Sequence, residues 1–478
     1  MHFLLNRLPD RLRQRDTGWH SPYPAGSSSE GNVDHGTPGI GAASYSLINP
    51  RKMTPIACVL VMMAIWAALY VVAPLEPYGA PTLYPYLLLG ASFAALLLGF
   101  CMFEPRRLPA PALDREEFRA SLVQLYKVSY ALGFLGIAFR AIDWIAFRGL
   151  SISLDIADNL EKVKEGGSNP FSTIAIFLIP LTIAPYIFHA VARRNGMRVG
   201  RPWLAIAPAI VWPMLAVMAG SRSTIFMQVG MIVIARVLIL PSFNRRAALA
   251  VFVLFIVLVH AAGFIFIQRI EGFGVSIDRV ARFSVFTHLI PSTPDYYHTM
   301  AGLDDPWRQV FFIDVMMMQY FMHGVPEFTY LVDHFTKENA WGSYTFTAVV
   351  RIYSIIAGTA YDPDAIVNMT PRQGVYTTIF GPFYVDFGPL IPFVGFLIGC
   401  LVSWVRNRVL RGDVAALPFY VALIMQVVAA VIVNAIVSAY GIFYDLAFLG
   451  FWIGCLALGR RGVRSIKFRF ASPGSART

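Results

Sequence analysis

A histidine and a glutamate stand four residues apart at His323 and Glu327, within a long polar stretch from about residue 268 to residue 381. Either side chain can take a proton from a hydroxyl group, so the spacing predicts that the two face one another and supply a general base. Asp386, at the start of the following apolar run, is the third candidate base. These three residue types predict a reaction in which a hydroxyl group is deprotonated.

Four arginine or tyrosine side chains predict contacts to a phosphorylated substrate. Arg222 stands in a Gly-Ser-Arg-Ser sequence between two apolar runs, where small neighbours let a bulky headgroup approach. A guanidinium group stays charged and pairs bidentately with phosphate oxygens. We expect Arg222 to be the main contact to a phosphate group and Arg269 to assist it, while Arg372 and Tyr376 orient the substrate. The alternative for Arg222 is that it only reaches the bilayer headgroups.

Charged residues also occur inside predicted membrane spans, where they need partners. Arg140 and Asp143 lie three residues apart on one face of a helix and are expected to pair. Such a pair is either structural or faces a wet cavity, so Arg140 is also a candidate substrate contact. Asp386 needs a partner as well, for which Arg140 and Arg222 are the candidates.

The polar stretch has no spacing typical of a metal or nucleotide site. An HExxH pattern is absent, and Pro326 disturbs the helix that would align His323 and Glu327 as ligands. A GxxxxGK[ST] loop, and a GxGxxG pattern between a strand and a helix, are absent as well. We therefore expect no metal and no other cofactor.

The elements that position these residues are predicted to be membrane helices. Of the 478 residues, 56% are hydrophobic and 14% are charged, whereas soluble domains have about 25% charged residues. Apolar runs of about 20 residues recur, and the alternation typical of barrel strands is absent. We predict an all-α polytopic membrane protein with ten spans, at residues 54–74, 83–103, 125–147, 170–192, 202–220, 224–242, 247–267, 382–404, 416–439 and 441–458.

Ten spans place both termini on one side, and basic residues identify that side as the cytoplasm. Lys and Arg are frequent in the segments on the side of the termini, whereas the short connections opposite contain few, among them Lys162, Lys164 and Arg222. The polar stretch then lies on the outer side of the membrane, opposite the cytoplasm. The net charge of +11 follows from this topology, so we expect the lipid bilayer as a partner and no nucleic acid.

The chain divides into five parts by composition. We predict a disordered cytoplasmic tail, spans one to seven, the large periplasmic loop, spans eight to ten and a basic cytoplasmic tail, at residues 1–52, 53–267, 268–381, 382–458 and 459–478. Within the loop, the apolar residues 310–322 are too few to span and predict a helix at the interface or a re-entrant one. Counting them as a span would reverse the topology.

Several motifs occur in an order that resembles a known enzyme family. Gly-Ser-Arg-Ser at residues 220–223 lies at a span end, a long external stretch follows, and Tyr376-Thr-Thr leads into Asp386-Phe-Gly at the next span. Over roughly residues 120–405 the chain thereby resembles the bacterial oligosaccharide repeat unit polymerases, which are Wzy-type O-antigen polymerases. Some members carry paired Arg-x10-Gly patterns in external loops. The polar stretch has none, so arginine roles are not carried over from those members.

The resemblance implies a metal-independent glycosyltransferase of the multispanning C type. Its substrates would be undecaprenyl-diphosphate-linked oligosaccharides, and it would move the growing glycan from its lipid carrier to an incoming repeat unit. It also implies synthesis of O-antigen, capsule or exopolysaccharide at the outer face of the bacterial inner membrane. A chain-length-regulating co-polymerase would be a partner.

Three rival functions stay open at this point. An O-antigen ligase would move finished polymer and use the same leaving group. A lipid-linked oligosaccharide flippase or exporter would be expected to have broken helices and charges along a path at the membrane midplane. A scaffold for glycan assembly would tolerate loss of the arginines. Most of the unusual polar residues lie near one predicted outer face, which favours an enzyme over a transporter.

Overall fold

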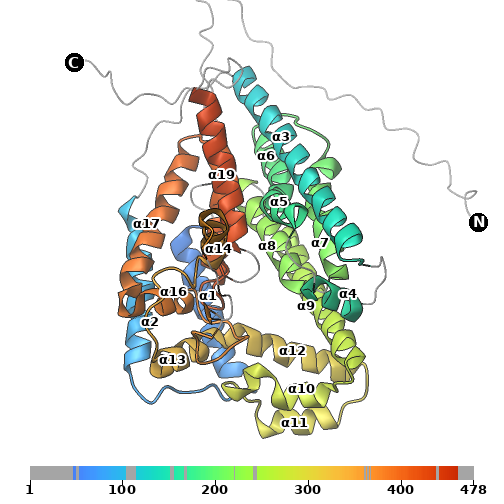
Figure 1. The fold of residues 1–478 in the computed structure, drawn as a ribbon, viewed down its shortest axis with the longest axis vertical. Helices are drawn as coiled ribbons and strands as arrows, with labels where there is room; N and C mark the ends of the chain where they lie inside the picture. The colour runs from blue at the N-terminus through green and yellow to red at the C-terminus, as the bar shows by residue number, and fades with distance from the viewer. Residues whose placement is uncertain are drawn as a thin grey trace, which may run out of the picture. The chain divides into compact units, whose positions relative to one another are not determined.

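The computed structural model describes residues 47–49, 53–103, 115–150, 156–165, 169–219, 221–240, 245–359, 362, 365–366, 368–437 and 441–460. Nearly all of the predicted N-terminal tail, and residues 461–478 of the predicted C-terminal tail, lie outside these ranges. Every regular element in the described ranges is a helix (Figure 1), which confirms the all-helical class. Seven helical units are long and apolar enough to cross a membrane, and three apolar helices are shorter.

The ten predicted spans each coincide with a helix or a helical unit. Those of spanning length are α1 (Pro55–Val72), α2 (Tyr84–Met102), α3 (Arg115–Ile142) with a π-helical end (Asp143–Phe147), α5 (Pro170–Leu178) joined to α6 (Ala184–Arg194), α9 (Arg245–Gly272), α16 (Phe380–Phe387) joined to α17 (Ile391–Leu410), and α19 (Gly441–Arg460). The shorter helices are α7 (Pro202–Met218), α8 (Arg222–Ile239) and α18 (Leu417–Ala429). Apolar helices of this number support a membrane protein.

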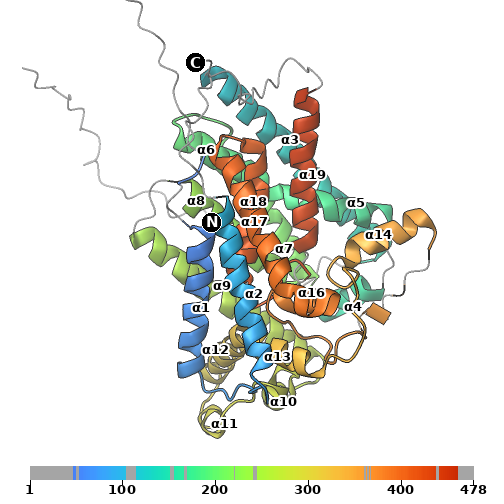
Figure 2. The ribbon, with the colours of Figure 1, turned by 90° about the vertical axis from the view of Figure 1, so that its left-hand side faces the viewer.

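The polar stretch folds into short helices. These are α10 (Ile277–Phe283), α11 (Pro294–Ala301), α12 (Trp307–Met322), α13 (Gly324–His334) and α14 (Thr347–Ala357). Figures 1 and 2 show α10 to α13 gathered at one end of the long helices. The helix predicted over 310–322 is confirmed as α12, which begins three residues earlier. It packs on α9, where Asp314 lies 3.3 Å from the imidazole of His260.

Backbone hydrogen bonds show which connections lie together. After α1, the amides of Glu76 and Tyr78 donate to the carbonyls of Pro291 and Leu289 in the polar stretch, at 2.9 and 2.7 Å. Before α1, the amide of Asn49 donates to Leu238 near the end of α8, at 2.9 Å. The C-terminal end of α1 therefore lies near the polar stretch, whereas its N-terminal end lies near the end of α8.

Glycines let α2 and α17 pack closely. A Cβ atom at Gly99 would lie 2.3 Å from the carbonyl oxygen of Phe396, and one at Gly399 would lie 2.3 Å from that of Leu96. Small residues at such contacts let helix backbones approach, which is how apolar helices gain packing energy within a bilayer. This contact fixes α17, and with it α16, against the N-terminal part of the chain.

One predicted span is shorter than expected. The apolar run predicted as a helix over 416–439 stays helical only to Ala429 in α18, and turns follow it to residue 437. The amide of Ile379 donates to Ala430 at 2.8 Å, and the amide of Asn434 donates to Thr377 at 3.1 Å. The helix ends here because the chain just before α16 takes over its hydrogen bonding. Non-helical backbone at such depth is tolerated where it is buried in protein or lines a cavity.

The packing of α2 on α17 predicts opposite effects for two substitutions in one helix. Gly99→Ala should lower the thermal unfolding temperature of the detergent-solubilised protein, because its Cβ meets backbone that cannot move aside. Gly90→Ala should be neutral or raise it, since nothing lies within 4 Å and alanine favours the helix by about 1 kcal/mol. Equal effects of the two substitutions would contradict close packing at Gly99.

Candidate functional site

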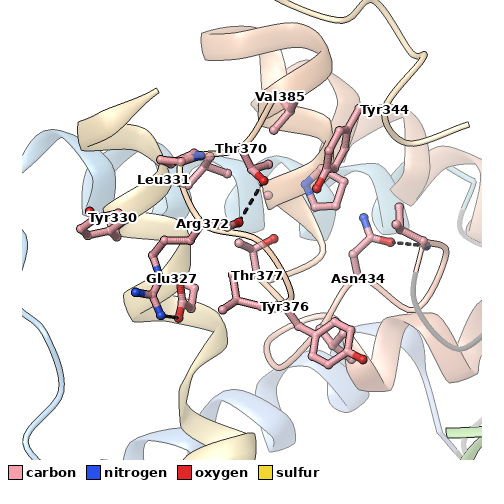
Figure 3. Close-up of a pocket in the computed structure, with 16 residues that line it drawn as sticks. Glu327, Tyr330, Leu331, Tyr344, Thr370, Arg372, Tyr376, Thr377, Val385 and Asn434 are labelled. Atoms are coloured by element: carbon pink, nitrogen blue, oxygen red, sulfur yellow. Dashed lines mark hydrogen bonds and ion pairs between the residues drawn. The ribbon is translucent and has the colours of Figure 1, made fainter. Parts of the chain in front are cut away.

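A cavity of about 160 Å³ lies where the polar stretch meets the break after α18 (Figure 3). Five segments line it: α13, the turn that contains Tyr344, the connection over 370–377, the start of α16 and residues 433–437. Its polar lining consists of Glu327, Tyr330, Tyr344, Thr370, Arg372, Tyr376, Thr377 and Asn434. The non-helical backbone after α18 therefore does line a cavity. Three of the predicted site residues, Glu327, Arg372 and Tyr376, are brought together there.

A bidentate ion pair joins Glu327 and Arg372 at this cavity. Nε of Arg372 lies 3.0 Å from Oε2 and Nη2 lies 3.1 Å from Oε1 of the carboxylate. Nη2 also donates to the carbonyl of Val285, and the guanidinium carbon lies 5.7 Å from the centre of the Tyr330 ring. Within the described part of the chain, Nη1 has no hydrogen-bond acceptor. The arginine is thus held rigidly by one edge and keeps one donor group for a ligand.

Glu327 is placed for proton transfer near neutral pH. Its side chain is 1% exposed. Burial raises the pKa of its carboxyl group to about 7, and the hydrogen bonds and charge of Arg372 oppose this rise. A carboxyl group whose pKa lies near the working pH can both take up and release a proton.

The side chains of His323 and Glu327 have separate partners, and among the described residues no hydrogen bond joins them. Because a carbonyl group only accepts, Nδ1 carries the proton that is donated to Tyr320 at 2.6 Å. Among the described residues Nε2 has no hydrogen-bond partner, and the ring lies against Phe286 and Tyr376 with centroids 4.8 and 5.9 Å away. Complete burial lowers the pKa of His323 to about 4, so the ring is neutral. His323, at the junction of α12 and α13, therefore contacts Tyr376, while Glu327 pairs with Arg372.

Asp386 is fully buried and does not line the cavity. Its carboxylate accepts three backbone N–H groups, from Gly342 at 2.9 Å, Tyr344 at 3.0 Å and Thr345 at 2.8 Å. These groups belong to a turn over residues 340–346, which we call the anchored turn. An arginine partner had been predicted, and the structure satisfies the charge with backbone amides instead. Asp386 therefore positions the turn that brings Tyr344 to the cavity.

Arg140 forms the predicted pair with Asp143, at 3.1 Å. The buried carboxylate of Asp143 also accepts hydrogen bonds from Nε of Arg148 at 3.1 Å and from the side-chain amide of Asn169 at 2.6 Å. Asn169 caps α5, so the cluster ties the end of α3 to the start of α5. Arg140 is not among the residues that line the cavity, and it is not the partner of Asp386.

Neither Arg269 nor Arg222 is found in the cavity lining. The side chain of Arg222 is outside the described part of the structure. Arg269 is in the last turn of α9, with its guanidinium carbon 5.4 Å from the centre of the Phe266 ring. α8 begins at Arg222. Their roles as diphosphate contacts stay predictions.

Several residues of the cavity were missed from the sequence. Asn434 is one of the few polar residues in the run predicted as a span over 416–439, and a polar residue within a span is a known signal of a cavity. Its side chain donates to Ile379 at 2.7 Å and accepts from the amide of Ile436 at 2.9 Å. Tyr344 and Thr370 carry no local signal, because only the anchored turn and the path of the following connection bring them together.

Removal of one acceptor oxygen at Asp386 should destabilise the anchored turn. In Asp386→Asn an NH2 group would replace one of the two acceptor oxygens, and a buried amide would lose its partner at a cost of about 1–3 kcal/mol. We expect a lower unfolding temperature and faster proteolysis near residues 340–346. Asp295→Asn, at an exposed position of α11, should leave both unchanged. Identical behaviour of the two variants would refute the anchoring role of Asp386.

Comparisons with known proteins add no relative to this geometry. No protein-family model, no curated protein and no solved structure matches the chain. What the cavity does must therefore follow from its own residues and their contacts.

Proposed function

We propose that this protein is a membrane glycosyltransferase that polymerises oligosaccharide repeat units carried on undecaprenyl diphosphate. The products would be O-antigen, capsule or exopolysaccharide, made at the outer face of the bacterial inner membrane. The observation that carries the proposal is the Glu327–Arg372 pair in a cavity at the end of a bundle of apolar helices. It places a phosphate-binding cation beside a carboxylate that can exchange a proton.

The proposed topology has ten spans with both termini in the cytoplasm and the polar stretch in the periplasm. The bonding of the α1–α2 connection to residues 289 and 291 supports it, since alternate crossings put these two segments on one side. Asn49 and the end of α8 are likewise bonded to each other, as the opposite side requires. A lipid diphosphate at the outer leaflet would then reach the cavity from the membrane.

The reaction needs a leaving group, a base and a place for two glycans. An acceptor hydroxyl attacks the anomeric carbon, the bond from this carbon to the phosphate oxygen breaks, and the lipid diphosphate leaves with the electron pair. Nη1 of Arg372 would stabilise the charge that develops on the diphosphate. The hydroxyl proton passes to the Glu327 carboxylate. The diphosphate already activates the donor, so neither a nucleotide nor a metal enters the scheme.

Among the three candidate bases, Glu327 fits this scheme best. It lines the cavity, whereas His323 and Asp386 do not. The bidentate pair favours the ionised carboxylate, and a diphosphate that competes for Arg372 weakens the pair just when the base is required. His323 and Asp386 would then be positioning residues that support Tyr376 and the anchored turn. Tyr330, Tyr344 and Tyr376 provide aromatic faces for sugar rings.

The guanidinium fork of Arg372 should be essential. With purified protein and lipid-linked repeat units, Arg372→Lys should lower the transfer rate by about tenfold to a hundredfold, the equivalent of one charged hydrogen bond. The matched control is Arg308→Lys, which alters an arginine paired with Asp278 elsewhere in the polar stretch and should keep the wild-type rate. A folded Arg372→Ala variant with the wild-type rate would remove this cavity from the mechanism.

A pH profile tests the base separately. Glu327 acts when deprotonated, so kcat/KM should be full above its pKa and fall as the pH drops through about 7. Arg372 lowers this pKa, so Arg372→Gln should move the acidic limb to higher pH in the residual activity. Arg308→Lys should leave the limb in place. A flat profile between pH 6 and 8 would exclude Glu327 as the base.

The deletion phenotype separates the proposal from its rivals. Single repeat units left on the lipid carrier indicate a polymerase. Long unattached polymer indicates a ligase, whose donor has the same leaving group, and intermediates trapped in the cytoplasm indicate an exporter.

A further inference from the structure

The helix α14 carries an exposed apolar stripe. Phe346, Val349, Tyr353 and Ile356 follow one another at intervals of three, four and three residues, so they lie along one face of the helix. Their exposed fractions rise along this face from 37% and 40% to 66% and 80%. With a rise of 1.5 Å per residue, the stripe is about 15 Å long.

α14 is exposed on two faces, because Arg351 is exposed opposite the stripe of large apolar side chains. Ser354 is 6% exposed, whereas its neighbour Tyr353 on the stripe is 66% exposed. A surface helix in water turns its apolar face toward the core and its polar face outward. α14 turns large apolar side chains away from the chain, which indicates that hydrocarbon covers them.

The base of α14 lies beside a helix of spanning length. In the anchored turn, the amides of Ala340 and Trp341 donate to the carbonyls of Val385 and Asp386, each at 3.0 Å. These two acceptors are in α16, within the candidate span Phe380–Leu410. Figure 2 shows α14 projecting from this position at the edge of the helices. The stripe is therefore attached at the level of a candidate span.

Trp341 adds a second, independent observation. Its backbone φ is +50°, a left-handed conformation that is strained for a bulky residue, and its side chain is 73% exposed. Such strain persists only where the surroundings over-determine it. Here the hydrogen bonds to Asp386 hold the turn in this conformation, which leaves the indole ring of Trp341 exposed. Exposed tryptophans of this kind suit the boundary between headgroups and hydrocarbon.

The stripe begins close to the cavity, since Phe346 follows the lining residue Tyr344 by two positions. Tyr344 precedes α14 and Thr370 follows it, and both line the cavity beside Arg372. Figure 3 shows Tyr344 and Thr370 close together on the same side of the cavity. A ligand with its diphosphate at Arg372 thus has the start of an apolar helix next to it, joined to the cavity wall through Tyr344.

We propose that α14 and Trp341 form a lipid-side wall that binds the hydrocarbon chain of the polyprenyl diphosphate. The inference rests on the proposed function for the diphosphate at Arg372, and it adds the residues that recognise the lipid. The wall holds the first isoprene units along the stripe and places the diphosphate at the cavity. It therefore selects long apolar carriers over short or water-soluble ones.

Photo-crosslinking tests the wall directly. A benzophenone amino acid at Ile356 is compared with one at Val253, which is 49% exposed on the spanning helix α9. In nanodiscs that contain undecaprenyl diphosphate, labelling of the polyprenyl chain at position 356 should exceed that at 253 by at least tenfold. Equal labelling at the two positions, which indicates bulk lipid, would overturn the proposal. So would crosslinks at position 356 to another protein or to a second copy of this chain.

Kinetics provide a second measurement. Val349→Ser with Ile356→Ser should raise KM at least fivefold for undecaprenyl-linked repeat units and less than twofold for farnesyl-linked ones. The matched control, Leu249→Ser with Val253→Ser on α9, should change neither KM. An equal rise of KM for the undecaprenyl-linked and the farnesyl-linked substrate would overturn the proposal that α14 binds the hydrocarbon chain. Crosslinking that persists in protein without transferase activity would instead overturn the proposed reaction and keep the lipid site.

Discussion

Backbone groups inside an apolar environment must be hydrogen-bonded, and this constraint shapes the cavity. α18 stops at Ala429, and the turns that follow would leave amides and carbonyls unpaired in lipid. Residues 377–379 and the side chain of Asn434 satisfy them. Because the polar stretch supplies these bonds just before α16, it is drawn against the broken span. The cavity forms between the two, with its polar lining already positioned.

Two buried carboxylates near the cavity are stabilised in different ways, and this difference separates architecture from chemistry. Asp386 is held by three backbone amides of one turn, which cannot leave without unfolding that turn. Glu327 is held by the side chain of Arg372, a cation for which an anionic substrate can compete. The first arrangement gives the carboxylate a structural role. The second gives a carboxylate whose proton affinity responds to what the cavity binds.

The sequence predicted elements better than it predicted partners. Hydropathy located all ten apolar helices, and the three-residue spacing of Arg140 and Asp143 predicted their ion pair, because both signals are local. Glu327, Arg372 and Tyr376 were singled out, but the pairing of residues 327 and 372 depends on the fold between them. Hydropathy also could not reveal the end of α18, since the residues of the break are as apolar as those of the helix. The amide partners of Asp386 have no side-chain signal at all.

The cavity and the apolar stripe belong to one excursion of the chain between α13 and α16. A lipid-linked sugar has three parts, which require hydrocarbon, a cation and a polar cavity in that order. In the proposed function α14 would provide the first, Arg372 the second, and the tyrosines with Asn434 the third. All three are tied to the broken spans by the anchored turn and by residues 377–379. A site for a soluble sugar would not need an apolar helix exposed at its edge, and a simple lipid anchor would not need the ion pair behind it.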